Sequence, residues 1–115
     1  MKAGARAEQT AAQFLQRQGL RLLEANYRCR FGEIDLIVQD GPTLVFVEVR
    51  LRSHSDFGGA AASIDARKQH KLILTAQHYL SHLSPLPPCR FDALLLADAT
   101  DANRIEWLKG AFELG

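Results

Sequence analysis

The chain has 115 residues, of which 47% are hydrophobic and 23% charged, and this composition favours one folded domain spanning 1–115 over an intrinsically disordered chain. A net charge of +1 argues against binding nucleic acid by bulk charge but leaves room for a local basic patch. The chain shows no membrane-length apolar run, no apolar signal segment and no metal-binding pair between its two cysteines, so we expect a reduced, cytoplasmic protein.

The first half of the chain predicts a helix followed by three strands. Apolar residues recur at helical spacing over 3–18, and Gly19 follows at the position of a C-terminal cap. Residues 20–28 predict a strand. Residues 31–40 and 43–52 are rich in β-branched and aromatic residues, and the turn at Gly41-Pro42 makes them a predicted hairpin.

The second half predicts a loop, a helix and one or two strands. Residues 53–60 contain turn formers and a Gly-Gly pair, which indicates a loop. A helix is expected from about Ser63 to Leu83, where the proline-rich segment SPLPPC ends it. The run RFDALLLAD predicts a buried strand, and the tail RIEWLKGAF a further strand or short helix. This order predicts an α/β fold with helices against a mixed sheet.

Acidic residues in the hairpin are the first functional signal. Side chains alternate between the faces of a strand, so Glu33 and Asp35 share one face. If the hairpin loop has an even length, Asp35 lies opposite Glu48 and Glu33 lies opposite Arg50. An odd loop would break this register.

The surroundings of these acids are apolar on both predicted faces of the hairpin. Like charges directly opposite each other destabilise a sheet, so an Asp35–Glu48 pair makes sense if a cation neutralises it. Mg²⁺ accepts such a site, made of carboxylates, a backbone carbonyl and water, and the carbonyl of Val49 is a candidate ligand. The alternative is that these acids are edge-strand charges or plain ion pairs beside the arginines, with no metal.

The segments G32-E-I-D-L-I37 and F46-V-E-V-R50, followed by Arg52, resemble the YraN-like family of predicted bacterial endonucleases. That family is similar to archaeal Holliday-junction resolvases and belongs to the restriction-endonuclease-like, PD-(D/E)xK superfamily. The resemblance covers nearly the whole chain. Further matching positions are Gly4, Glu8, Asn26, Arg28, Lys68, Ala76, Tyr79, Leu80 and Arg90-Phe91-Asp92.

This resemblance implies a fold, a cofactor and a set of roles. The fold would be a restriction-endonuclease-like αβββαβ core with a mixed central sheet flanked by helices. Asp35 and Glu48 would hold Mg²⁺ or Mn²⁺, Glu8 would join them, and Glu33 would have a supporting role. The implied reaction is hydrolysis of DNA phosphodiesters, at structured, branched or damaged DNA, and a homodimer is compatible with the resemblance.

One departure from the family pattern concerns the lysine of the E-x-K motif, which is Arg50 here. By its position Arg50 would be a catalytic residue that grips the scissile phosphate, because arginine suits phosphate oxygens. It does not deprotonate, however, and so cannot act as a base. Lys68, on the second predicted helix, is a candidate to supply the missing ammonium group. Because of this departure, a non-catalytic nucleic-acid-binding or adaptor module on the same fold stays open, as does a protein-interaction domain.

Basic residues are expected to surround the acids. Arg67, Lys68 and Lys71 fall within one turn of the second helix, and Arg52 lies at the end of the hairpin. With Arg50 and the arginines at 28 and 30, they predict a positive rim around a negative centre, as a phosphodiester backbone would require. Aromatic residues are too few to indicate a stacking platform for single strands.

Overall fold

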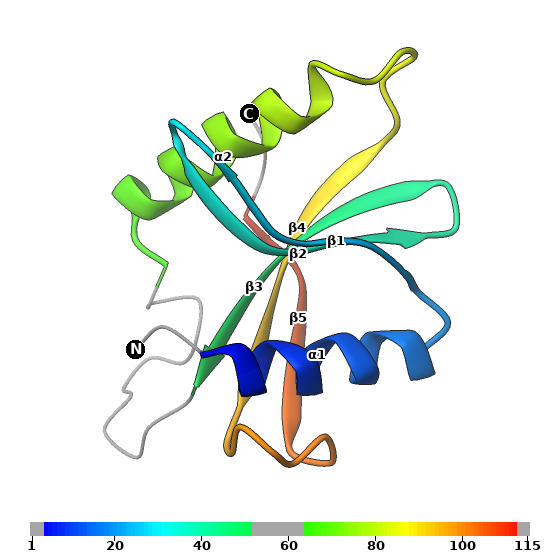
Figure 1. Ribbon diagram of the computed structural model, residues 1–115, viewed down its shortest axis with the longest axis vertical. Coiled ribbons are helices and arrows are strands. Elements are labelled where there is room, and N and C mark those ends of the chain that lie inside the picture. Colours follow the sequence, from blue (N-terminus) through cyan, green and yellow to red (C-terminus); the bar gives the residue numbers. More distant parts are fainter. Residues whose placement is uncertain (1–3, 52–63, 113–115) are drawn as a thin grey trace.

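The computed structural model describes residues 4–51 and 64–112 (Figure 1). Two helices and five strands follow the predicted order, and the tail is a strand. The elements are α1 (Ala5–Arg17), β1 (Arg21–Cys29), β2 (Gly32–Asp40), β3 (Thr43–Leu51), α2 (Ala66–Leu80), β4 (Cys89–Leu96) and β5 (Ile105–Phe112). Neither helix in these two ranges is long and apolar enough to cross a membrane.

The ends of both helices follow from local chemistry. After α1, Gly19 adopts φ +93° and the amide of Leu20 donates to the carbonyl of Leu15 at 3.0 Å, which closes the helix as predicted. Helix α2 is shorter than expected. Its first turn is capped by Asp65, whose carboxylate accepts a hydrogen bond from the Lys68 amide at 2.9 Å. The predicted loop over 53–60 lies outside the described residues.

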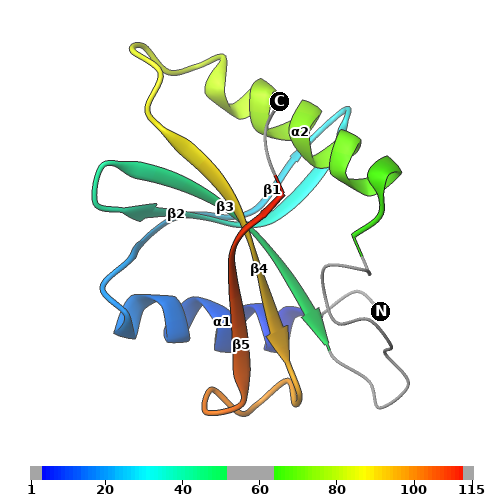
Figure 2. The ribbon, with the colours of Figure 1, turned by 180° about the vertical axis from the view of Figure 1, so that it is seen from behind.

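The five strands form one mixed sheet in the order β1-β2-β3-β4-β5. Strands β3 and β4 are parallel, and every other neighbouring pair is antiparallel. Helix α1 packs on one face of the sheet and α2 on the other (Figures 1 and 2). The predicted mixed sheet with flanking helices is confirmed, and each face carries its own apolar core.

The hairpin of β2 and β3 has the predicted register for only part of its length. Leu36 pairs with Val47, and Asp40 pairs with Thr43 beside the turn. Before Leu36, β2 pairs with β1 alone, while β3 beyond Val47 pairs with β4. The predicted cross-strand pair of Glu33 with Arg50 is therefore wrong, because Glu33 pairs with Arg28. Asp35 and Glu48 lie beyond the β2–β3 ladder, but their side chains still meet, as predicted.

Strand twist gives the physical reason for this divergence, because each twisted strand follows its better-paired neighbour. In Figure 1 the β1–β2 hairpin bends toward α2, whereas β3 runs toward the start of α1. Ile34 consequently packs in the apolar cluster beneath α2, not on the opposite face where strict alternation would place it. The divergence opens the sheet at the position of the acidic residues.

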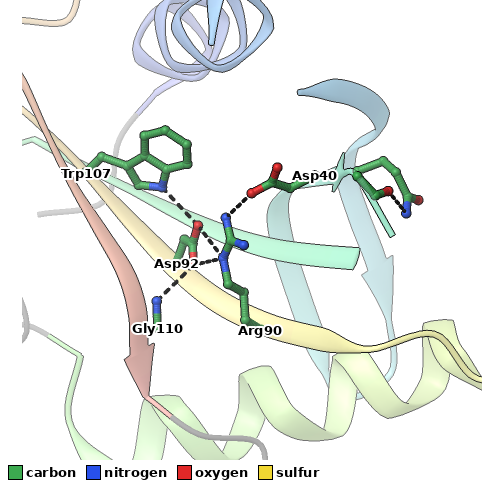
Figure 3. Close-up of polar contacts among 7 residues, drawn as sticks. Asp40, Arg90, Asp92, Trp107 and Gly110 are labelled. Carbon is green, nitrogen blue, oxygen red and sulfur yellow. Dashed lines mark hydrogen bonds and ion pairs between the residues drawn. The ribbon is translucent and has the colours of Figure 1, made fainter. Parts of the chain in front are cut away.

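A polar cluster around Asp92 connects β4 with β5 and with the turn at the end of β2 (Figure 3). The buried carboxylate of Asp92 accepts hydrogen bonds from Arg90 Nε at 3.0 Å, Trp107 Nε1 at 2.9 Å and the Gly110 amide at 3.0 Å. Arg90 also donates to Asp40 at 2.8 Å. Because Asp92 and Asp40 accept these hydrogen bonds, the cluster fastens β5 and the β2 turn to β4.

Candidate active site

A cleft of about 400 Å³ lies where β2 and β3 diverge, beneath the first turns of α2. Its floor includes Asp35 and Glu48, and its opposite wall carries the cations of α2. The lining residues are Gly32, Glu33, Asp35, Glu48, Asp65, Arg67, Lys68, Lys71 and Leu72. The acidic side chains of β2 and β3 therefore face the basic side chains of α2 across the cleft.

Asp35 bridges the gap between the diverging strands. Its Oδ2 accepts a hydrogen bond from the Val49 amide at 2.8 Å, although the residue is only 2% exposed. Burial raises the pKa of Asp35 to about 8, with further contributions from the charge of Glu48 and a hydrogen bond with its carboxyl group. Two carboxyl groups thus adjoin in a site that water hardly reaches, and their repulsion favours a bound proton or a bound cation.

Glu48 is the most heavily paired acid of the cleft. Its Oε2 lies 2.8 Å from Lys68 Nζ and 3.2 Å from Arg50 Nε. Lys68 comes from α2, whereas Arg50 lies on β3 with Glu48. The structure therefore brings together three of the residues singled out from the sequence, with Asp35 beside them.

Arg50 and Lys68 differ in how far they reach the cleft. The Arg50 side chain is 10% exposed, and its Nε is buried without an aligned hydrogen bond despite its approach to Glu48. The Lys68 side chain is 34% exposed and lines the cleft, which Arg50 does not. Lys68 is therefore the cation beside Glu48 that a molecule in the cleft can contact.

The remaining acids occupy the periphery of the site. Glu8 is buried on α1, and its charge adds to the raised pKa of Asp35, after burial and Glu48, so it approaches the pair from the opposite helix. Glu33 lines the cleft and forms an ion pair with Arg28 at 3.1 Å. Glu33 thus pairs with an arginine of β1.

The donor set suits a hard divalent cation. In a strand the N–H and C=O of one residue point to the same neighbour, so the Val49 carbonyl faces β2 along with the amide that Asp35 accepts from. Among residues 4–51 and 64–112, no three His, Cys, Asp or Glu side chains gather as a metal-binding group. Two carboxylates, one carbonyl and water molecules remain, which is a coordination that Mg²⁺ adopts.

The predicted basic rim is present in part. Arg67, Lys68 and Lys71 all line the cleft from α2. Arg52 lies outside the described residues, so its place at the rim stays a prediction.

Sequence reasoning missed three residues that shape the cleft. Asp65 caps α2 and lines the opening, and an Asp three residues before Lys68 at a helix start was a usable signal. Gly32 begins β2 at φ +149°, and a Cβ there would meet Thr75 Oγ1 at 3.2 Å, so its lack of a side chain lets β2 approach α2. Leu72 also lines the cleft, and no polar pattern marked it.

Comparison with known proteins identifies the family. The model of uncharacterised protein family UPF0102 matches residues 7–96, so the chain belongs to that family. A UPF0102 protein of Nitrosomonas europaea is 60% identical over 110 residues, covering 96% of this chain and 92% of the relative. UPF0102 proteins of Methylobacillus flagellatus (58% identical; 92% of each chain covered) and Pseudomonas syringae (50%; 97% of this chain, 94% of the relative) are also similar. These names attach no activity to the family.

Proposed function

We propose that this UPF0102 protein is a divalent-metal-dependent endonuclease that hydrolyses DNA phosphodiesters, on a restriction-endonuclease-like variant of its mixed α/β fold. The observation that carries the proposal is the buried Asp35–Glu48 pair at the floor of a cleft walled by three cations. Two adjoining buried carboxyl groups repel each other, and a bound cation would relieve that repulsion. The free thiols of Cys29 and Cys89 support a reducing, cytoplasmic setting as part of the proposal.

Asp35, Glu48 and the Val49 carbonyl would hold Mg²⁺ or Mn²⁺, with Glu8 assisting from α1. When bound, such an ion supplies an activated water molecule and stabilises charge on the leaving oxygen. The Val49 amide fixes the orientation of Asp35 through their 2.8 Å hydrogen bond. The protein thereby places its ligands before any substrate arrives, which is the basis of electrostatic preorganisation.

Lys68 would take the part of the motif lysine that Arg50 replaces. Its ammonium group already lies 2.8 Å from Glu48 Oε2 and lines the cleft. From there it can contact a phosphate oxygen next to the metal ligands. Arg50, buried against Glu48 at 3.2 Å, would orient that carboxylate and stabilise its charge, and would not grip the phosphate directly.

Arg67 and Lys71 would bind the DNA backbone on either side of the scissile phosphate, together with Arg52. Both described residues line the cleft on the same helix as Lys68. Contacts of this kind position the backbone without reading sequence. Branched or damaged DNA is the substrate that the resolvase resemblance suggests.

A non-catalytic nucleic-acid-binding or adaptor module is the second candidate. The observation in its favour is that Lys68 and Arg50 already balance Glu48 without a metal ion. Such a module would bind DNA with an affinity that falls as salt rises, and it would not cleave. An Arg50→Lys variant separates the two candidates further, because cleavage gained only in that variant would indicate a site one residue short of activity.

The test combines metal binding with cleavage. Mg²⁺ and Mn²⁺ are titrated by calorimetry into the wild type and Asp35→Asn, and both proteins are then incubated with linear, forked and four-way-junction DNA. Cleavage by the wild type, with loss of both metal binding and cleavage in the variant, supports the nuclease. Equal cleavage by the two proteins refutes the assigned site. DNA binding without metal binding or cleavage supports the second candidate.

A further inference from the structure

The two-residue turn of the β1–β2 hairpin carries Arg30 and Phe31 beside helix α2. Cys29 pairs with Gly32 across this turn, so the two residues form its tip. The exposed guanidinium of Arg30 lies over the ring of Phe31, 4.8 Å from its centroid. His78 of α2 contacts the same ring in a T-shaped arrangement with centroids 6.3 Å apart.

The hairpin tip stands at one end of the cleft. Moving along β2 from the tip, Phe31 lies at His78, Gly32 lies against Thr75, and Glu33 lines the cleft with Lys71. Ten helical residues separate His78 from Lys68, which corresponds to about 15 Å along the axis of α2. Strand β2 therefore leads along α2 from the acidic floor of the cleft to the Arg30–Phe31 stack.

The composition of this surface matches an unpaired nucleic-acid strand. Arg30 and Phe31 offer a flat cationic plane backed by an aromatic ring, on which a base can stack. Between that plane and Lys68, Lys71 lines the path, and the negative charge of Glu33 is paired with Arg28. A base held inside a duplex cannot reach such a plane, whereas a base in a single strand can.

We infer that an unpaired strand leaves the cleft over Arg30 and Phe31, so that the substrate carries a single-stranded segment next to the scissile phosphate. This inference rests on the proposed nuclease function and specifies its substrate class. It departs from the sequence expectation that aromatic residues are too few for a stacking platform. The fold gathers Tyr27, Phe31 and His78 at one place, with Tyr27 Oη 2.5 Å from His78 Nδ1.

Fluorescence anisotropy without divalent ions tests the inference on wild type, Phe31→Leu and Arg30→Gln, with Arg21→Gln as the control. Leucine keeps the apolar contact with His78 but removes the ring, and Arg21 is an exposed arginine at the other end of β1. We expect Phe31→Leu and Arg30→Gln to weaken binding of a single-stranded oligonucleotide and of a forked duplex about tenfold. Blunt duplex binding and the Arg21→Gln control should change by less than about twofold.

A base analogue gives an independent reading. The fluorescence of 2-aminopurine placed in the single-stranded arm should be quenched by wild-type protein and not by Phe31→Leu. If Phe31→Leu leaves single-strand binding and quenching unchanged, or weakens blunt duplex binding equally, the inference is wrong while the nuclease proposal stands. If wild-type protein binds no DNA of any form, both fail.

Discussion

The carboxylate of Asp35 on β2 accepts a hydrogen bond from the amide of Val49 on β3, at 2.8 Å, beyond the point where the two strands stop pairing. A side chain thus satisfies a backbone donor that an unbroken sheet would have satisfied with a carbonyl. The same contact aims the Asp35 carboxyl group at Glu48. One hydrogen bond therefore serves both the continuity of the fold and the geometry of the proposed site.

Asp35→Asn should separate these two roles. The amide oxygen of asparagine still accepts from Val49, so the variant should fold, but it lacks the charge that a divalent cation needs. We expect cleavage to fall at least about 100-fold, with an unchanged circular dichroism spectrum. Asp35→Ala also loses the hydrogen bond and should be less stable than Asp35→Asn by about 1–3 kcal/mol in urea denaturation. Equal stability of the two variants would contradict the structural role of the bond.

The raised pKa of Asp35 predicts a pH dependence of stability. Burial and the Glu48 carboxyl group raise that pKa from 3.8 to about 8, so the folded protein keeps a proton that the unfolded chain releases. The stabilisation from this group is complete below the unfolded pKa and is lost as pH rises through the folded pKa. Relative to wild type, Asp35→Asn should therefore gain at least about 1 kcal/mol in unfolding free energy between about pH 5 and about pH 8. Urea denaturation at both values measures it, and a pH-independent difference would disprove the shift.

Lys68→Gln should reduce cleavage more than Lys71→Gln. Lys68 contacts Glu48 at 2.8 Å, whereas Lys71 lines the cleft on the exposed side of the same helix. Removing Lys68 leaves the buried Glu48 less well balanced and removes the cation beside the metal ligands, so the cleavage rate should fall about 10- to 100-fold. Lys71→Gln should mainly weaken DNA binding and lower its salt dependence. Single-turnover rates at saturating DNA distinguish these effects, and equal rates for both variants would remove Lys68 from the proposed mechanism.

Asp92→Ala should destabilise the protein without touching the proposed chemistry. The Asp92 carboxylate is fully buried and accepts from Arg90, Trp107 and the Gly110 amide (Figure 3). Its loss would leave Arg90 paired with Asp40 and would leave two N–H donors without their acceptor, which corresponds to about 3–5 kcal/mol of unfolding free energy. The exposed Glu24→Ala on β1 is the control and should stay within about 0.5 kcal/mol. A small effect at Asp92 would mean that water replaces the carboxylate.

Local sequence patterns predicted the elements and the hairpin register near its turn, because alternation and turn length are properties of adjacent residues. Leu36 and Val47 pair as the even loop requires. The pattern failed beyond that pair. Where β2 leaves β3 is decided by the twist of the whole sheet and by β2 approaching α2 at Gly32. The sequence of the hairpin alone therefore does not predict the point at which β2 and β3 separate.

The sequence predicted which residues form the site, but not all of the contacts between them. Asp35 and Glu48 were identified, yet Arg50 was expected to oppose Glu33 and instead lies against Glu48. The contact of Lys68 with Glu48 depends on where α2 lies relative to β3, which is a tertiary property. The Asp92 cluster was not predicted, because its donors Trp107 and Gly110 lie in the tail, for which the sequence pattern allowed either a strand or a short helix.

Divalent cations should stabilise the wild-type protein, and more strongly at higher pH. A cation between Asp35 and Glu48 replaces the proton that their repulsion retains, so binding must release that proton and strengthens as pH rises toward the Asp35 pKa of about 8. Ligand linkage then predicts a gain of about 2.7 kcal/mol at a cation concentration of about 100 times Kd. Thermal unfolding with Mg²⁺ or Mn²⁺ at about pH 6 and about pH 8 measures this gain. Asp35→Asn is the matched control because it keeps the Val49 bond and removes the charge. A melting temperature that rises equally in the variant would place the cation elsewhere.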